Sequence, residues 1–158
     1  LRSVKDAQIT AFSTSSSVAT LPVTMGCLEN NLKVSKSTTS FVLPIGATVN
    51  MDGTSLYQGI AVVALAQFHM VDLSILQQLI IVGTATLASI GAAAIPSAGL
   101  ILMMVVLESV GLNPLWIAII FPIDRILDMC RTVVNVTGDA SVAAIIAYSE
   151  NEINSVDD

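Results

Sequence analysis

Long stretches without a formal charge are the feature that most constrains this chain. No Asp, Glu, Lys or Arg occurs within 37–51, 53–71, 73–107 or 109–123. Placing one charge at the centre of a bilayer costs about 2.5–3.5 kcal/mol, so gaps of this length are typical of segments buried in a membrane. Because a backbone in lipid must satisfy its own hydrogen bonds, and because 54% of the residues are hydrophobic, the sequence predicts an all-α integral membrane protein.

The apolar segments are of two kinds. A membrane-spanning helix needs about 20 mainly apolar residues, and 41–67 and 115–147 reach that length while carrying polar residues near their middles. We expect them to be two interrupted transmembrane helices. The gap at 73–107 is longer, and its small residues and proline at 89–97 divide it into two arms, which predicts a re-entrant helical hairpin. Residues 13–22 form a second run of small residues that ends in proline, and they predict a second hairpin tip.

The order of these features repeats along the chain. In each half a hairpin tip precedes a helix that is interrupted by polar residues, at 50–54 in the first half and at 135–139 in the second. Paired interruptions are typical of secondary transporters built as an inverted repeat, with the binding site at the breaks. Chance similarity between two Ser- and Gly-rich turns is the alternative.

Charge and metal-binding residues exclude several classes of protein. Twelve acidic and six basic residues leave a net charge of −6, so no basic surface is available for nucleic acid. Cys27, Cys130 and His69 lack the spacing of a zinc site. The basic residues outside the last helix flank the first hairpin, and the positive-inside rule places that end in the cytoplasm. They are Arg2, Lys5, Lys33 and Lys36.

Polar residues of the last helix share one face, because they are spaced 4, 3, 4 and 4 residues apart. They are Asp124, Asp128, Arg131, Asn135 and Asp139. Arg131 presents a planar fork of donors that suits a carboxylate, and Asp128 either pairs with Arg131 or receives an ammonium group. Internal ion pairs are the structural alternative, above all for Asp124. Oxygen donors suited to a desolvated Na⁺ lie at the breaks, namely Asn50, Asp52, Asn135 and Asp139.

Four motifs, in this order, closely resemble those of the dicarboxylate/amino acid:cation symporters, the glutamate transporter family. They are Ser15–Ser17 with Thr20–Pro22, LPIGATVNMDGT at 43–54, ASIG at 88–91 and DMCRTVVNVTGD at 128–139. The resemblance covers 7–149 and implies the C-terminal part of the transport domain of an elevator transporter. The full-length parent would be a homotrimer in the plasma (inner) membrane, multi-pass in the lipid bilayer. We expect the chain to be a fragment, since the family's helices one to six have no counterpart in it.

The resemblance also assigns parts to the chain. It implies an inner re-entrant hairpin at 1–36, a seventh helix at 37–71, an outer re-entrant hairpin at 72–112, an eighth helix at 113–150 and an acidic tail at 151–158. The implied function is secondary active symport of acidic amino acids, glutamate or aspartate, coupled to Na⁺, and not enzymatic catalysis.

Residue roles transfer from the family to matching positions. The implied substrate-binding residues are Ser16, Ser17, Thr54, Ile95, Pro96, Ser97, Ala98, Gly99, Asp128, Arg131, Thr132 and Asn135. The implied cation ligands are Gly46, Thr48, Asn50, Met51, Asp52, Ser89, Ile90, Ala92, Asn135 and Asp139, several of them through backbone carbonyls. Arg131 would bind the side-chain carboxylate of the substrate, and Asp128 its amino group.

The chain departs from the family pattern in several places. Relatives carry an extra arginine in the inner tip or directly after the substrate-binding aspartate, where this chain has Ser15 and Met129. Arg125 is a candidate replacement, or a partner of Asp124. The outer tip has Ala94 and Ser97 at positions where glycine is common, and we expect a stiffer or differently shaped tip because glycine adopts positive φ freely and alanine does not.

Three other functions remain open at this point. One is proton coupling in a dicarboxylate or glutamate symporter, and a second is a truncated membrane product that does not transport. The third is intramembrane aspartyl proteolysis by Asp52 and Asp139, although the Gly-x-Gly-Asp signature of such enzymes is missing around Asp139.

Overall fold

Helices form nearly all of the chain in the computed structural model, which describes residues 2–90, 92 and 97–153. With η for a 3₁₀-helix, they are η1 (Arg2–Val4), α1 (Lys5–Thr14), α2 (Ser17–Asn31), α3 (Lys36–Val49), α4 (Asp52–Phe68), α5 (Ile75–Ile90), α6 (Ala98–Ser109), η2 (Pro114–Ile119), η3 (Phe121–Ile123) and α7 (Asp124–Ser149). The expected all-α class is confirmed for the described residues. Within that part of the chain, no single helix is both long enough and apolar enough to cross a membrane.

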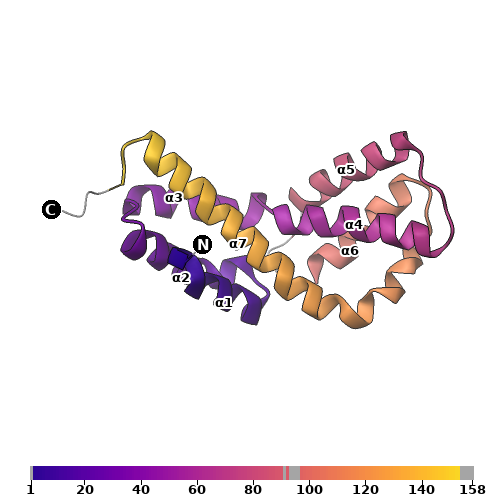
Figure 1. Cartoon of the computed structure of the whole chain (residues 1–158), viewed down its shortest axis with the longest axis horizontal. Helices are drawn as coiled ribbons and strands as arrows, with labels where there is room; N and C mark the ends of the chain where they lie inside the picture. Colours follow the sequence, from indigo (N-terminus) through magenta and orange to yellow (C-terminus); the bar gives the residue numbers. More distant parts are fainter. Residues whose placement is uncertain (1, 91, 93–96, 154–158) are drawn as a thin grey trace.

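The helices form two lobes that share α7. Figure 1 shows α1, α2 and α3 in one lobe and α4, α5 and α6 in the other, with α7 running diagonally between them. Each lobe contains a hairpin of consecutive helices, α1 with α2 and α5 with α6. In one lobe the hairpin precedes α3, and in the other it follows α4.

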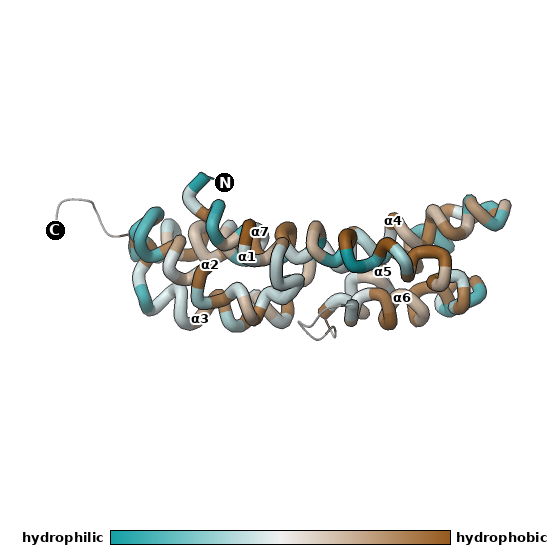
Figure 2. The backbone as a smooth tube through the Cα atoms, turned by 90° about the horizontal axis from the view of Figure 1, so that it is seen from below, coloured by the Kyte–Doolittle hydropathy of each residue, from teal (hydrophilic) through white to brown (hydrophobic). Residues whose placement is uncertain are grey.

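Each lobe has its own apolar core. One core joins α1, α2 and α3 to the C-terminal half of α7 and includes Ala7, Ala11, Leu28, Leu43, Ala143 and Ala147. The small alanine side chains allow close approach of these helices. The other core joins α4, α5 and α6 and includes Val62, Leu65, Ile81, Met103 and Leu107. Figure 2 shows apolar stretches along both lobes.

The predicted interruption at 50–54 is observed. Asn50 and Met51 leave helical geometry, with ψ angles of 76° and 53°, so that α3 ends at Val49 and α4 begins at Asp52. The amide of Asn50 still donates to the carbonyl of Gly46, at 2.8 Å, and closes α3. The break therefore consists of Asn50 and Met51, between the last residue of α3 and the first residue of α4.

The predicted interruption at 135–139 is wrong, because α7 continues through this segment. No proline lies within 124–149, and one glycine in a helix costs only about 1 kcal/mol. The hydroxyl groups of Thr137 and Ser141 donate to carbonyls one turn earlier, at 2.7 and 2.8 Å, rather than opening the helix. The helix begins later than expected, since Pro114 and Pro122 start short 3₁₀-helices before it.

The first hairpin tip is shorter than the sequence suggested. Only Ser15 and Ser16 lie outside the helices, and Pro22 is already inside α2. The Ser16 hydroxyl accepts a hydrogen bond from the Ala19 amide at 3.2 Å, which caps α2 and lets the helix begin early. In the second hairpin 91 and 93–96 lie outside the described residues, so the expected tip cannot be followed there.

Candidate functional site

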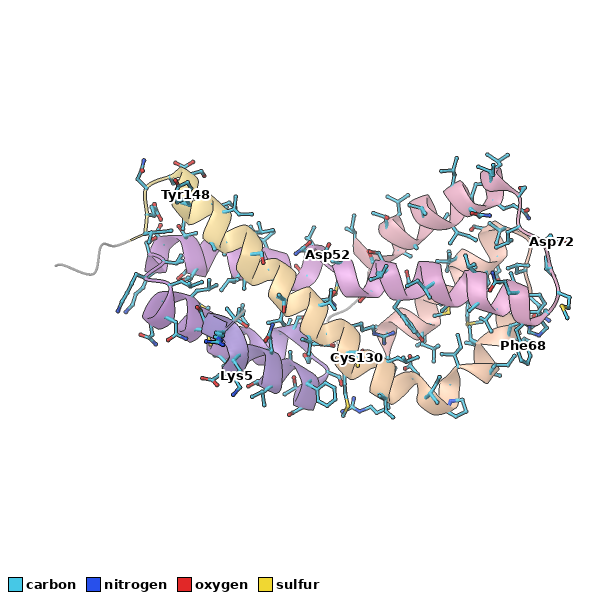
Figure 3. All side chains as sticks on the ribbon, in the orientation of Figure 1. Lys5, Asp52, Phe68, Asp72, Cys130 and Tyr148 are labelled. Carbon is cyan, nitrogen blue, oxygen red and sulfur yellow. The ribbon has the colours of Figure 1, made fainter. Side chains whose placement is uncertain are left out.

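The break between α3 and α4 lies against the middle of α7, where the two lobes meet; Figure 3 labels Asp52 and Cys130 near this crossing. A cavity of about 20 Å³ lies here, between the break, α7 and both hairpins. Its lining residues are Ser15, Ser17, Met51, Thr54, Ala92, Gly99, Asp128, Arg131, Thr132 and Asn135. Residues from segments far apart in the sequence thus converge on one small polar cavity.

Most residues predicted to bind substrate line this cavity. They are Ser17, Thr54, Gly99, Asp128, Arg131, Thr132 and Asn135. Ser16, Ser97 and Ala98 lie at the adjoining helix starts and are not among the lining residues. Ile95 and Pro96 lie outside the described residues.

Arg131 is 94% buried and is held by two carboxylates. Its Nε donates to Asp128 Oδ1 at 2.8 Å, and its Nη1 lies 3.5 Å from Asp124 Oδ1. The guanidinium carbon also lies 4.6 Å from the centre of the Tyr57 ring, within the range of a cation–π contact. Nη1 nevertheless has no hydrogen-bond partner among the described residues. The guanidinium group is therefore held in a fixed position, and its Nη1 can still donate a hydrogen bond.

Glycine at 99 is needed for this placement. A Cβ atom there would lie 3.1 Å from Arg131 Nη1 and 2.9 Å from Thr54 Cγ2. The start of α6 can therefore approach the guanidinium group only because Gly99 has no side chain. The Gly99 carbonyl accepts a hydrogen bond from Gln58 Nε2 at 2.9 Å, which fastens α6 to α4 beside the cavity.

Asp128 joins α7 to the second hairpin. Its Oδ2 accepts a hydrogen bond from the Ser97 amide at 2.8 Å, while its Oδ1 pairs with Arg131. Ser97 adopts a left-handed conformation, with φ of 62°. This is a position where glycine is common in the family, and a serine adopts this conformation less readily than glycine does.

Asn135 caps α4 from a different helix. Met51, the residue before α4, makes no side-chain cap, and the amide of Gly53 donates instead to Asn135 Oδ1 at 2.7 Å. Asn135 Nδ2 lies 3.3 Å from both Thr54 Oγ1 and Met51 Sδ. The side chain of one α7 residue thus sets the position of the break and of two cavity residues.

The oxygen donors predicted for Na⁺ meet beside the cavity. Asn50 Nδ2 donates to Asp139 Oδ1 at 3.0 Å. Two glycines make room for the acidic groups, because a Cβ at Gly46 would lie 2.7 Å from Asp139 Oδ1 and one at Gly138 would lie 2.7 Å from Asp52 Oδ2. The described residues contain no cluster of three or more His, Cys, Asp or Glu that could hold a metal ion. A cation here would need the Asn50 side chain and backbone carbonyls as well.

Thr48, Ser89, Ile90 and Ala92 are the implied cation ligands that would bind through their backbone carbonyls. Ser89 and Ala92 are buried and joined by a hydrogen bond from the Ala92 amide to the Ser89 carbonyl at 3.0 Å. Thr48 and Ile90 lie on exposed positions of α3 and α5. No contact among the four carbonyls is established by these positions, and the set stays a prediction.

Sequence reasoning missed three residues of the site. Ser15 lines the cavity with a buried hydroxyl that has no partner among the described residues. Tyr57 donates to Asp124 Oδ1 at 3.0 Å, and Gln58 reaches Gly99. Tyr57 and Gln58 follow Thr54 by three and four residues, so helical spacing was the signal that could have found them. Arg125 is exposed, and Asp124 pairs with Arg131 instead.

Comparison with known proteins gives consistent matches over the whole site. The sequence model of the sodium:dicarboxylate symporter family matches residues 1–149. An excitatory amino acid transporter of Caenorhabditis elegans is 49% identical over 158 residues, which cover 99% of this chain and 31% of the relative. Excitatory amino acid transporter 1 of Ambystoma tigrinum is 52% identical over 155 residues, with coverage of 98% and 28%. Excitatory amino acid transporter 2 of Mus musculus is 50% identical over 152 residues, with coverage of 96% and 27%.

The chain spans less than a third of the length of these relatives. The matched residues nevertheless include the cavity, both hairpins and the break between α3 and α4. The protease alternative is wrong, since the matching family and relatives are transporters. The chain belongs to the sodium:dicarboxylate symporter family.

Proposed function

We propose that the chain forms the substrate- and cation-binding part of a transporter that couples uptake of acidic amino acids to Na⁺. The observation that carries this proposal is the Arg131 guanidinium group, which is buried on the wall of the cavity beside Asp128 and whose Nη1 makes no hydrogen bond among the described residues. An acidic amino acid carries a side-chain carboxylate and an ammonium group. Arg131 is suited to the first and Asp128 to the second.

Substrate binding requires an exchange of partners in the cavity. In the structure Arg131 is paired with Asp128 and with Asp124. A substrate carboxylate would engage the free donors of Arg131, and the substrate ammonium would take over Asp128. Thr54, Thr132 and Asn135 line the same cavity and would supply hydroxyl and amide groups as further polar anchors, while Ser17, also on its lining, would contact the α-carboxylate. Neutral amino acids would make the ammonium contact with Asp128 but not the carboxylate contact with Arg131, so they would bind more weakly.

Coupling to Na⁺ follows from the shared helix break. Asn50 and Asp139 form the proposed cation site, and Met51, directly after Asn50, lines the substrate cavity. Asn135 contacts Met51 and caps α4. A cation that orders Asn50 would therefore also fix Met51 and Thr54, and substrate affinity would rise with Na⁺ concentration.

We place this unit in a membrane as part of a multi-pass protein of the plasma (inner) membrane. Large apolar side chains are strongly exposed on several helices, including Phe41, Phe68, Ile75 and Leu87. A groove between α4 and α7 has an almost entirely apolar surface, and a groove between α4 and α5 is lined mainly by apolar residues. Surfaces of this kind require lipid or further protein segments. The re-entrant course of both hairpins, the elevator movement and a homotrimeric parent follow from the family resemblance.

A chimera tests the transport function directly. The matching segment of the Ambystoma tigrinum relative is replaced by this chain, and uptake of radiolabelled aspartate is measured in proteoliposomes under an imposed Na⁺ or proton gradient. We expect uptake that depends on the Na⁺ gradient. Full uptake in sodium-free buffer with a proton gradient would instead support proton coupling and overturn the assignment of the cation site.

A further inference from the structure

The C-terminal strap, residues 150–153, returns from the end of α7 to the start of α3. Asn151 adopts a left-handed conformation, with φ of 56°, and reverses the chain. The Asn151 amide donates to the carbonyl of Tyr148, and the Glu152 amide to the carbonyl of Ala147 at 2.8 Å. These two bonds form the Schellman motif, which ends a helix in a defined geometry. The direction of the strap is therefore set by α7 itself.

The strap is bonded to the segment between α2 and α3. Val34 and Ile153 form an antiparallel bridge, and the Ser35 amide donates to the Glu152 carbonyl at 2.9 Å. The Glu152 carboxylate also accepts hydrogen bonds from the hydroxyl groups of Ser35 and Thr38. Figure 1 shows the end of α7 and the start of α3 side by side, far from the crossing of the lobes.

The Glu152 carboxylate supplies the start of α3 with a negative charge that the first turn of α3 lacks. No acidic residue lies in the first turn of α3, where a negative charge is favoured by the helix dipole. Glu152 supplies one from the strap, and Glu29 of α2 supplies another by accepting a hydrogen bond from Thr39 at 2.7 Å. The hydroxyl donors hold the pKa of the Glu152 carboxyl below its usual range. The bonds therefore favour the charged form of Glu152.

Helix α3 is thus bonded at both of its ends, at its start to the strap that follows α7 and at its far end to α7 itself. At the far end Asn50 bonds Asp139, and between the two ends Leu43 and Ala47 are buried on the side of α3 that packs against α7. At 1.5 Å per residue, Thr38 and Asn50 lie about 18 Å apart along α3. Helix α3 contains Pro44, so the coupling of its start to the break rests on its packing against α7 along this length.

We propose that Glu152 is a positioning residue for the break, holding the start of α3 against α7 so that Asn50 meets Asp139. The step to cation binding rests on the proposed function, but the step from Glu152 to Asn50 does not. Glu152→Gln keeps the size of the side chain and removes its charge. Glu150→Gln, two residues earlier on an exposed position, removes the same charge and is the matched control.

The test is amide hydrogen exchange of the full 158-residue chain in lipid nanodiscs, first in Na⁺-free buffer. In Glu152→Gln we expect exchange to rise roughly two- to tenfold at 47–53 as well as at 35–39, as for substitutions along a chain of coupled residues. Glu150→Gln should change neither segment. Faster exchange at 35–39 alone, or equal changes in both variants, would overturn the proposal, because Glu152 would then act only on the local cap.

A second variant removes the groups at the start of α3 that donate to the strap. In Ser35→Ala/Thr38→Val the carboxylate loses its two hydroxyl donors, so adding Glu152→Gln should have little further effect at 47–53. An additive effect would overturn the proposal. Na⁺ is then titrated, and it should protect 47–53 in the unaltered chain at a lower concentration than in Glu152→Gln. Absence of protection in the unaltered chain would refute the proposed cation site, while the exchange result in Na⁺-free buffer would still decide the role of Glu152.

Discussion

Alanine at Gly46 is expected to weaken Na⁺ binding while leaving the chain folded. The added Cβ would lie 2.7 Å from Asp139 Oδ1 and 3.0 Å from Asp139 Cγ, closer than ordinary van der Waals contact. The carboxylate must then rotate away, and its 3.0 Å hydrogen bond from Asn50 is lost. The substitution thus displaces the one charged ligand that Asn50 holds in place.

The magnitudes follow from these contacts. A hydrogen bond to a charged group contributes about 1.5–3 kcal/mol, and alanine in place of a helical glycine gains about 0.5–1 kcal/mol. The net loss of stability at Gly46 should be about 1–2 kcal/mol. Loss of a carboxylate ligand should weaken Na⁺ binding roughly ten- to a hundredfold, which corresponds to about 1.4–2.8 kcal/mol. Cation affinity should therefore fall more clearly than stability.

Two other glycines in helix interiors provide matched controls. Gly59 in α4 and Gly83 in α5 have no atoms within 4 Å of an added Cβ. Alanine at either position should raise stability by about 0.5–1 kcal/mol and leave Na⁺ binding unchanged. Thermal unfolding in nanodiscs is followed while NaCl replaces choline chloride at constant ionic strength. A Na⁺ midpoint for Gly46→Ala within twofold of that for Gly59→Ala would refute the assignment of Asp139 as a ligand.

Further predictions test packing, specificity and pH dependence. Gly53→Ala should cost about 2–3 kcal/mol of stability in thermal unfolding, because its Cβ would lie 2.2 Å from the backbone carbonyl oxygen of Arg131; no loss relative to Gly59→Ala would contradict this. In the chimera, Arg131→Cys should weaken aspartate roughly ten- to a hundredfold and favour serine in competition uptake, whereas equal weakening of both would count against the carboxylate contact. Because the pKa of Glu152 is lowered, its contribution to stability is present above its usual pKa of 4.5 and is lost as pH falls through the lower folded value. The unfolding midpoint of the unaltered chain should therefore fall more steeply below pH 4.5 than that of Glu152→Gln, and parallel curves would show that Glu152 is not the group responsible.

Local sequence was sufficient for the helical class, the break after α3 and the polar face of α7. The uncharged gaps and small-residue runs predict helices and turns because they depend on neighbouring residues only. The five polar residues of α7 are all buried together, as their spacing predicted. Periodicity succeeds here because a helix places residues three and four apart on one side, whatever packs against it.

The second predicted break failed for an instructive reason. A glycine at 138 signals either a weak point in the helix or a close approach by another segment, and local sequence does not distinguish these possibilities. The structure shows a close approach, with Asp52 Oδ2 2.7 Å and Asn50 Nδ2 3.1 Å from the position of an added Cβ. Gly138 is therefore explained by packing between α7 and the break.

The sequence by itself determined that this chain is apolar and helical, and that it places acidic residues, asparagine and one arginine at the middle of its last helix. Only the tertiary structure decided which groups meet. Arg131 pairs with both Asp124 and Asp128, Asn135 caps α4 from α7, and Glu152 reaches the start of α3 across more than a hundred residues of sequence. These contacts depend on how the two lobes pack around α7, and the distances between remote segments are not encoded in the periodicity of any one segment.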